Sequence, residues 1–206
     1  VLYNTYLSFK IIWGNHVGAI CDAVGADADA VVDALALATE RIASVAYMRP
    51  GMGDGGACHP RDLIAMADLE RRHGLAPLFE SLAKWRDHQS TLLGLQVVRW
   101  ASLIGLPIAI LGRAYKPGVP LTDGSPSLLL LRQILDSGVS EGMVYTHDPA
   151  DGTEPSMDDP AVFVIATDHE QYRGLDYPAG SVVIDPWGTA EVRPSAGVTL
   201  VRPGRR

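Results

Sequence analysis

A cysteine in a glycine-rich turn is the residue best suited to chemistry in this sequence. The turn reads RPGMGDGGACHPRD and holds four glycines and two prolines. Cys58 comes just before Pro60, a residue suited to the first turn of a helix, so we expect its thiol near the positive end of a helix dipole, which favours the thiolate. Glycines without side chains leave the thiol accessible, and Asp62 would face the same space. The pattern fits a nucleophile and, about equally, a structural cysteine in a tight turn.

The same glycines match the dinucleotide fingerprint G-x-G-x-x-G through Gly51, Gly53 and Gly56. That fingerprint works where a buried strand ends and a helix begins directly afterwards. Arg49 and Pro50 precede these glycines instead, and we expect the next helix only at Pro60. The match is therefore weak, and it predicts no cofactor-binding residues.

The two cysteines are 37 positions apart, Cys21 in the first expected helix and Cys58 in the turn. Two cysteines do not make a disulfide framework, which favours a reducing, cytoplasmic location. His59 is merely adjacent to Cys58, so the spacing offers no zinc ligand set, and we expect no metal.

A second group of polar residues follows the strand expected at 107–111. It reads GRAYKP from Gly112 and is followed by Ser125-Pro126, a typical helix start. Loops at the carboxyl ends of parallel strands and the helix starts that follow them commonly bind phosphate. Lys116 could pair with such a phosphate, or it could be a solvated loop lysine.

The composition excludes several classes of protein. The chain has 206 residues and a formal net charge of −7, from 17 Lys and Arg against 24 Asp and Glu. This balance argues against nucleic acid and an anionic membrane surface as partners, and no apolar run approaches the roughly 20 residues that span a bilayer. Because the chain opens in mid-pattern without Met, we expect it to be a piece of a longer protein.

Two domains are expected, a helical one over residues 1–105 and a Rossmann-like parallel α/β one over residues 106–206. Apolar residues three or four apart predict one apolar face on a first helix that ends near Val24: Leu2, Tyr6, Phe9, Trp13, Val17 and Ile20. Further helices are expected over 28–39, 60–72 and 77–103. Strands over 107–111, 143–146, 161–166 and 181–184, with a helix over 126–135, indicate the parallel sheet.

Three motifs, in order, resemble the UDP-glucose/GDP-mannose dehydrogenase family of NAD-dependent nucleotide-sugar 6-dehydrogenases. Asn4-Thr5-Tyr6-Leu7 is similar to the start of its central helical domain, and PGMGDGGACHPRD to its active-site cysteine loop. LGRAYKP, with Ser125-Pro126 after it, is similar to the start of its C-terminal domain. The resemblance covers essentially the whole chain, as the central and C-terminal domains only.

The resemblance implies oxidation of a UDP-hexose C6 alcohol to the uronate with two NAD. Cys58 would attack the C6 aldehyde and carry the thioester, Asp62 would assist the water or the proton transfers, and Asn4 would stabilise the oxyanion. The implied substrate-binding residues are Lys116, Tyr115, Arg41, Tyr47, Gly55 and Gly56. A homodimer through the long first helix is also implied.

The sequence departs from the family pattern in several places. The NAD-binding domain and the catalytic lysine of the family would precede Val1, so we expect NAD to be bound mainly outside this chain and the chain alone to be inactive. Arg61 stands where the family has a lysine, and Asp123 and Trp187 stand where it has arginines. The alternative is a non-catalytic module of the same origin that binds nucleotide sugars or only dimerises.

Overall fold

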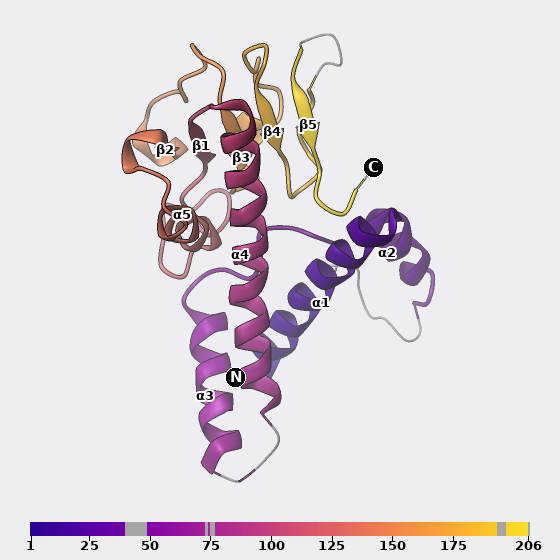
Figure 1. Cartoon of the computed structure of the whole chain (residues 1–206). Coiled ribbons are helices and arrows are strands. Elements are labelled where there is room, and N and C mark those ends of the chain that lie inside the picture. The colour runs from indigo at the N-terminus through magenta and orange to yellow at the C-terminus, as the bar shows by residue number, and fades with distance from the viewer. Residues whose placement is uncertain (40–48, 73, 75–76, 193–196, 206) are drawn as a thin grey trace. The chain divides into compact units, whose positions relative to one another are not determined.

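The computed structural model describes residues 1–39, 49–72, 74, 77–192 and 197–205 (Figure 1). These residues form two compact units, Val1–Gln89 with Pro203–Arg206, and Ser90–Arg202. The predicted α/β class is confirmed, with helices first and a parallel sheet after them. A domain boundary after residue 105 remains a prediction.

The helices of the first unit begin and end at residues whose chemistry suits those positions. They are α1 (Leu2–Val24), α2 (Ala28–Ala36), α3 (Cys58–Arg72) and the start of α4 (Leu78–Ile104). Gly25 ends α1 with a left-handed φ of 72°, and the Asp27 carboxylate caps α2 by accepting the Ala30 N–H at 3.0 Å. The expectation that α2 reaches residue 39 is wrong, because α2 ends at Ala36.

The sequence pattern predicts one apolar face on α1. Most of that face points away from the rest of the first unit. Leu2, Tyr6 and Phe9 are 68%, 61% and 44% exposed, whereas Thr5, Ser8 and Ile12 on a neighbouring stripe are buried. Ile12 packs with Leu63 of α3 and Leu82 of α4, beside Phe79. Periodicity therefore locates an apolar face correctly but does not tell whether the chain itself covers it.

The segment 203–205 returns to the first unit and packs against α1 at a contact between two glycines. Gly204 has a φ of 74°, and a Cβ placed there would lie 2.8 Å from the Cα of Gly18. Its N–H donates to Asp22 at 2.7 Å, and its carbonyl accepts the Ala28 N–H at 2.8 Å. Only residues without side chains allow this approach.

The second unit contains a five-stranded, all-parallel sheet with the order β2-β1-β3-β4-β5 (Figure 1). The pairing of β1 with β3 is in register from Ile108 with Val162 to Leu111 with Ile165. Four strands are predicted from the sequence; the fifth is short and half-exposed, and the prediction misses it. The strands are β1 (Ile108–Leu111), β2 (Val144–His147), β3 (Val162–Ile165), β4 (Val182–Ile184) and β5 (Thr199–Val201).

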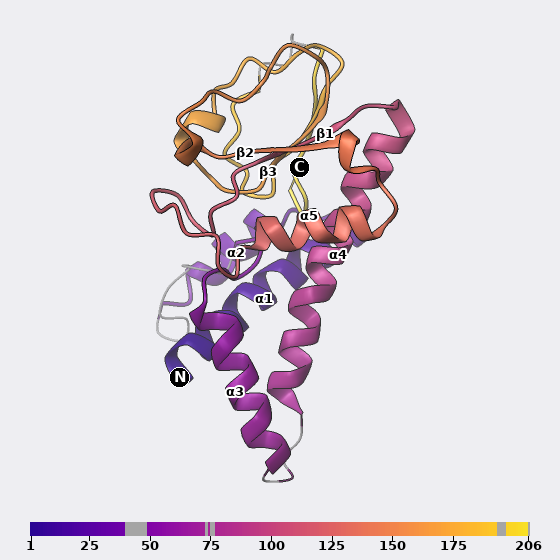
Figure 2. The same cartoon turned by 90° about the vertical axis from the view of Figure 1, so that its left-hand side faces the viewer.

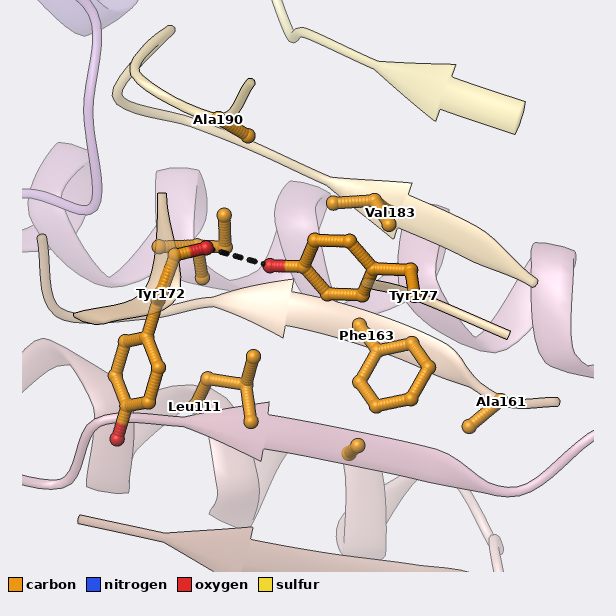
Figure 3. Packing of buried hydrophobic residues seen from close by; sticks show 9 residues of the cluster. Leu111, Ala161, Phe163, Tyr172, Tyr177, Val183 and Ala190 are labelled. Atoms are coloured by element: carbon orange, nitrogen blue, oxygen red, sulfur yellow. Dashed lines mark hydrogen bonds between the residues drawn. The ribbon is translucent and has the colours of Figure 1, made fainter. Parts of the chain in front are cut away.

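One face of the sheet packs against aromatic residues from the segment between β3 and β4 (Figure 3). The ring of Tyr177 lies edge-on to Phe163 with centroids 5.2 Å apart, and its hydroxyl donates to the Tyr172 carbonyl at 2.9 Å. On the other side of the sheet lies α5 (Pro126–Asp136), whose Leu130 and Ile134 are fully buried (Figure 2). Ser125 caps α5 as the sequence predicts, by accepting the Ser127 N–H.

No helix among the described residues has both the length and the apolar character needed to cross a bilayer.

Candidate active site

The thiol of Cys58 is exposed at the N-terminal end of α3, and Cys21 is buried. The helix begins at Cys58 itself, two residues earlier than predicted, because Pro60 is tolerated anywhere in a first turn, where its missing N–H breaks no helix bond. Gly53 and Gly56 have φ values of 111° and 83°, so the turn before the helix needs glycine at these positions. The sulfur therefore lies at the positive end of the helix dipole, as expected.

Asp62 and Asn4, both predicted as site residues, are brought together across 58 positions. The Asn4 side-chain amide donates to Asp62 Oδ2 at 3.0 Å, and Arg61 donates to Asp62 Oδ1 from Nε at 3.0 Å. The Asn4 amide, with Arg61 adding to it, holds the pKa of the Asp62 carboxyl below its usual range.

The Arg61 guanidinium interacts with both Asp62 and Cys58. The pKa of Arg61 is raised above its ordinary value, mainly by Asp62 and additionally by the thiolate form of Cys58. Arg61 thus interacts with two side chains at the start of α3. The structure thus gathers Cys58, Arg61, Asp62 and Asn4 at one helix start.

A polar network that the sequence does not predict lies beside these residues. The Ser8 hydroxyl is 3.0 Å from Asp54 Oδ2 and 2.8 Å from His59 Nδ1. Arg86 Nε donates to Asp54 Oδ1 at 2.5 Å. Asp54 and Ser8 are buried, with 2% and 0% of their surface exposed. Helical spacing could have pointed to two of these residues. Ser8 follows Asn4 by four residues and His59 precedes Asp62 by three, so each lies one helical turn from a predicted site residue.

Lys116 and Tyr115 lie in the second unit, in the loop after β1. Lys116 is exposed, and its ammonium is 5.5 Å from the centroid of the Tyr115 ring. The Tyr115 N–H donates to the Leu121 carbonyl at 3.0 Å, which closes the loop.

The chain itself uses the backbone N–H groups after β1, at a position where parallel sheets commonly bind phosphate. Asp148 Oδ2 accepts from the N–H groups of Arg113 and Ala114 at 2.6 and 2.9 Å. Burial raises the pKa of Asp148, but the N–H groups of Ala150, Ala114 and Arg113 outweigh burial and hold this pKa below its ordinary value. Gly112 offers no further room, since a Cβ there would lie 2.4 Å from Thr167 Cβ.

The described residues do not fit a dinucleotide cofactor. The Asp148 carboxylate occupies the N–H groups after β1. The glycines of the fingerprint should follow a strand, but the described regular elements of their unit are all helices. No group of three or more His, Cys, Asp or Glu side chains in the described part of the chain is placed to hold a metal ion.

The remaining predicted residues are placed as follows. Gly55 and Gly56 belong to the cysteine turn, and Arg41 and Tyr47 lie outside the described residues. Asp123 is exposed. Trp187 packs partly buried against the sheet core, and its backbone N–H donates to the buried carboxylate of Asp185 at 3.1 Å.

Residues 1–87 match the family described as "UDP-glucose/GDP-mannose dehydrogenase family, central domain". UDP-glucose 6-dehydrogenase AglM of Haloferax volcanii is 30% identical over 190 residues, which cover 84% of this chain and 43% of that protein. GDP-mannose 6-dehydrogenase of Pseudomonas putida is 29% identical, over 88% of this chain and 47% of that protein.

The structure of a UDP-glucose dehydrogenase from the hyperthermophilic archaeon Pyrobaculum islandicum is also similar to this chain. It superposes with a TM-score of 0.80 at 25% identity, over 100% of this chain and 50% of that one. The chain thus spans half or less of the length of these relatives.

Proposed function

Because the chain belongs to the UDP-glucose/GDP-mannose dehydrogenase family, we propose that it forms the part of a nucleotide-sugar 6-dehydrogenase that supplies the thiol nucleophile. The observation that carries this proposal is the exposed Cys58 at the start of α3, with the Arg61 guanidinium and the Asp62 carboxylate beside it. The substrate is a nucleotide-activated hexose, and the reacting position is C6.

Cys58 adds to the C6 aldehyde in this proposal. The thiolate forms a sulfur–carbon bond to the carbonyl carbon, and the carbonyl electron pair moves to the oxygen. Asn4 has two amide N–H groups, of which one donates to Asp62, so the second can donate to the developing oxyanion. Arg61 lies beside Cys58 and pairs with Asp62.

Asp62 suits the hydrolysis of the thioester that follows. Oδ1 faces Nε and Nη2 of Arg61 at 3.0 and 2.9 Å, whereas Oδ2 accepts one hydrogen bond, from Asn4, and has a lone pair left for water. Because its pKa is held low, Asp62 stays ionised and is a weak base. Its role is therefore to orient the water, and the proton of that water needs another acceptor.

NAD remains the hydride acceptor that the family resemblance implies. The two oxidation steps need such an acceptor, and the described residues do not fit it, so NAD would be bound elsewhere. This chain contributes the nucleophile, the water-orienting carboxylate and contacts to the nucleotide sugar.

Binding of the nucleotide sugar can be tested by calorimetry with UDP-glucose, UDP-N-acetylglucosamine and GDP-mannose. We expect one of them to bind the chain and the Cys58→Ala variant with equal affinity, and Lys116→Ala to bind it more weakly because the cation facing the phosphates is lost. Lys84→Ala is the control, since Lys84 pairs with Glu80 on the surface of α4. Absence of binding to all three compounds contradicts the proposal.

A homodimer formed through α1 is part of the same proposal. The exposed apolar stripe of Leu2, Tyr6 and Phe9 supports it, because large apolar side chains in one row on a helix favour burial against a partner. A second copy of this chain is the partner that we propose for this stripe.

A further inference from the structure

The Ser8 hydroxyl joins two side chains whose hydrogen-bonding abilities differ. The Asp54 carboxylate, paired with Arg86, can only accept, so the single hydrogen of Ser8 is directed to Asp54 Oδ2 at 3.0 Å. The Ser8 oxygen is then an acceptor toward its other neighbour. That neighbour is His59 Nδ1 at 2.8 Å, which must therefore carry the hydrogen.

This hydrogen-bond accounting assigns the tautomer of His59. A neutral imidazole carries one hydrogen, so protonation at Nδ1 leaves a lone pair on Nε2. His59 directly follows Cys58 in the first turn of α3, and its side chain is 18% exposed. The turn that holds the thiol thus holds a neutral nitrogen that can accept a hydrogen bond from water or from a sugar hydroxyl.

We propose that Asp54, acting through Ser8, is a positioning residue that holds His59 in the Nδ1-protonated tautomer and so presents Nε2 as a hydrogen acceptor at the cysteine turn. The inference rests on the proposed function for its use, since thioester hydrolysis needs an acceptor that the low-pKa Asp62 does not supply. The tautomer itself follows from the contacts alone.

The Asp54→Asn variant should reverse the direction in which hydrogen bonds are donated between residue 54, Ser8 and His59. Arg86 Nε is a donor, so it keeps the side-chain oxygen of the new amide facing it, and the amide NH2 group then faces Ser8. Ser8 must accept from the amide and donate to His59 Nδ1. The hydrogen of His59 is thereby moved to Nε2, with almost no change in side-chain shape.

His147 provides an internal reference of the opposite polarity. Its Nε2 is 2.8 Å from the Thr153 carbonyl oxygen, which can only accept, so Nε2 carries the hydrogen. Its Nδ1 is then an acceptor, 2.8 Å from the Tyr172 hydroxyl, whose one hydrogen also faces the His147 carbonyl oxygen at 3.3 Å. The parent chain should therefore contain one histidine in each tautomer.

The test is nitrogen-15 NMR of the histidine side chains in the uniformly labelled 206-residue chain, at about pH 8, where histidines are neutral. We expect His59 to show a protonated Nδ1 and His147 a protonated Nε2. In Asp54→Asn the two His59 resonances should exchange their shifts while those of His147 stay in place. In Ser8→Ala, His59 should lose its fixed tautomer.

Two results would overturn the proposal. One is a protonated Nε2 on His59 in the parent chain. The other is a His59 tautomer that stays the same in a variant whose His147 signals are native. If Asp54→Asn does not fold, Ser8→Ala decides alone. No nucleotide sugar is present in these samples, so the outcome is independent of whether the proposed function holds.

Discussion

The side-chain amide of Asn4 and the carboxylate of Asp62 lie 3.0 Å apart, although 58 residues separate them in the chain. One helical turn further along, Ser8 of α1 contacts His59 of α3 at 2.8 Å. These two contacts form a polar ladder between the helices, and Ile12 of α1 and Leu63 of α3 belong to one hydrophobic cluster. The start of α3, and with it Cys58, is thereby fixed against α1.

Asp62→Asn should weaken the fold in a pH-dependent way. The pKa of Asp62 is lowered in the folded chain, so on acidification the unfolded chain takes up the proton first. The ionised carboxylate therefore stabilises the fold above its unfolded pKa, about 3.9, and this stability is lost as the pH falls through the folded pKa.

Urea unfolding of the parent and the variant measures this difference. The parent should be more stable at neutral pH, and the gap should shrink below about pH 4. Asp68→Asn is the matched control on the same helix, because Asp68 pairs with the exposed Arg71 and Arg72. A gap for Asp62→Asn that does not change with pH would contradict the assignment.

Arg86→Ala should destabilise the first unit by about 3 kcal/mol, because it leaves the Asp54 carboxylate buried without its cation. Lys84→Ala, two positions away on α4, removes an exposed partner of Glu80 and should cost less than about 1 kcal/mol. Denaturant midpoints of the two variants give the comparison. Equal losses would mean that the Asp54 pair contributes no more than a surface pair.

Gly204→Ala should destabilise the fold more than Gly74→Ala, although the two glycines have similar backbone conformations. Both Gly204 and Gly74 have a positive φ, which costs an alanine about 1 kcal/mol. Only Gly204 also faces a neighbour, Gly18, so overpacking adds about 1 to 3 kcal/mol there. Thermal unfolding of the two variants should separate them, and similar melting temperatures would show that segment 203–205 does not pack tightly on α1.

The double variant Tyr6→Glu, Phe9→Glu should be monomeric if α1 forms the interface. Charges in the apolar stripe cost too much to bury in a dimer. Leu37→Glu is the control, since this residue is 83% exposed at the end of α2. Sedimentation velocity decides, and a monomeric parent chain or a dimeric double variant would contradict the proposed dimer.

Local signals in the sequence predict the helix ends and four strands well. Gly25, Asp27 and Ser125 each end or begin a helix by a mechanism that involves only a few neighbouring residues. The sequence does not predict which stripe of α1 is buried, because Tyr6 and Phe9 satisfy the same periodicity whether or not the chain covers them. The prediction starts α3 two residues late, because proline is compatible with several first-turn positions.

The site is predictable from the sequence only in part, because sequence patterns report local relations and not tertiary contacts. Cys58 and Asp62 are four residues apart on one helix, a local relation that spacing shows. Ser8, Asp54 and Arg86 meet through tertiary contacts between segments 32 to 46 residues apart, which no local pattern reports. Likewise, the loop after β1 has a sequence suited to phosphate, but the fold places the Asp148 carboxylate on its N–H groups.

The most direct test of the central claim is the rate of Cys58 alkylation by iodoacetamide, followed by mass spectrometry with and without a nucleotide-sugar 6-aldehyde. UDP-glucose, UDP-N-acetylglucosamine and GDP-mannose aldehydes are tried in turn, and the buried Cys21 is the internal reference. We expect Cys58 to react faster than Cys21, and one aldehyde to slow the Cys58 reaction several-fold by adding to its sulfur. Alkylation of Cys58 at an unchanged rate in saturating concentrations of all three aldehydes would contradict its role as the nucleophile.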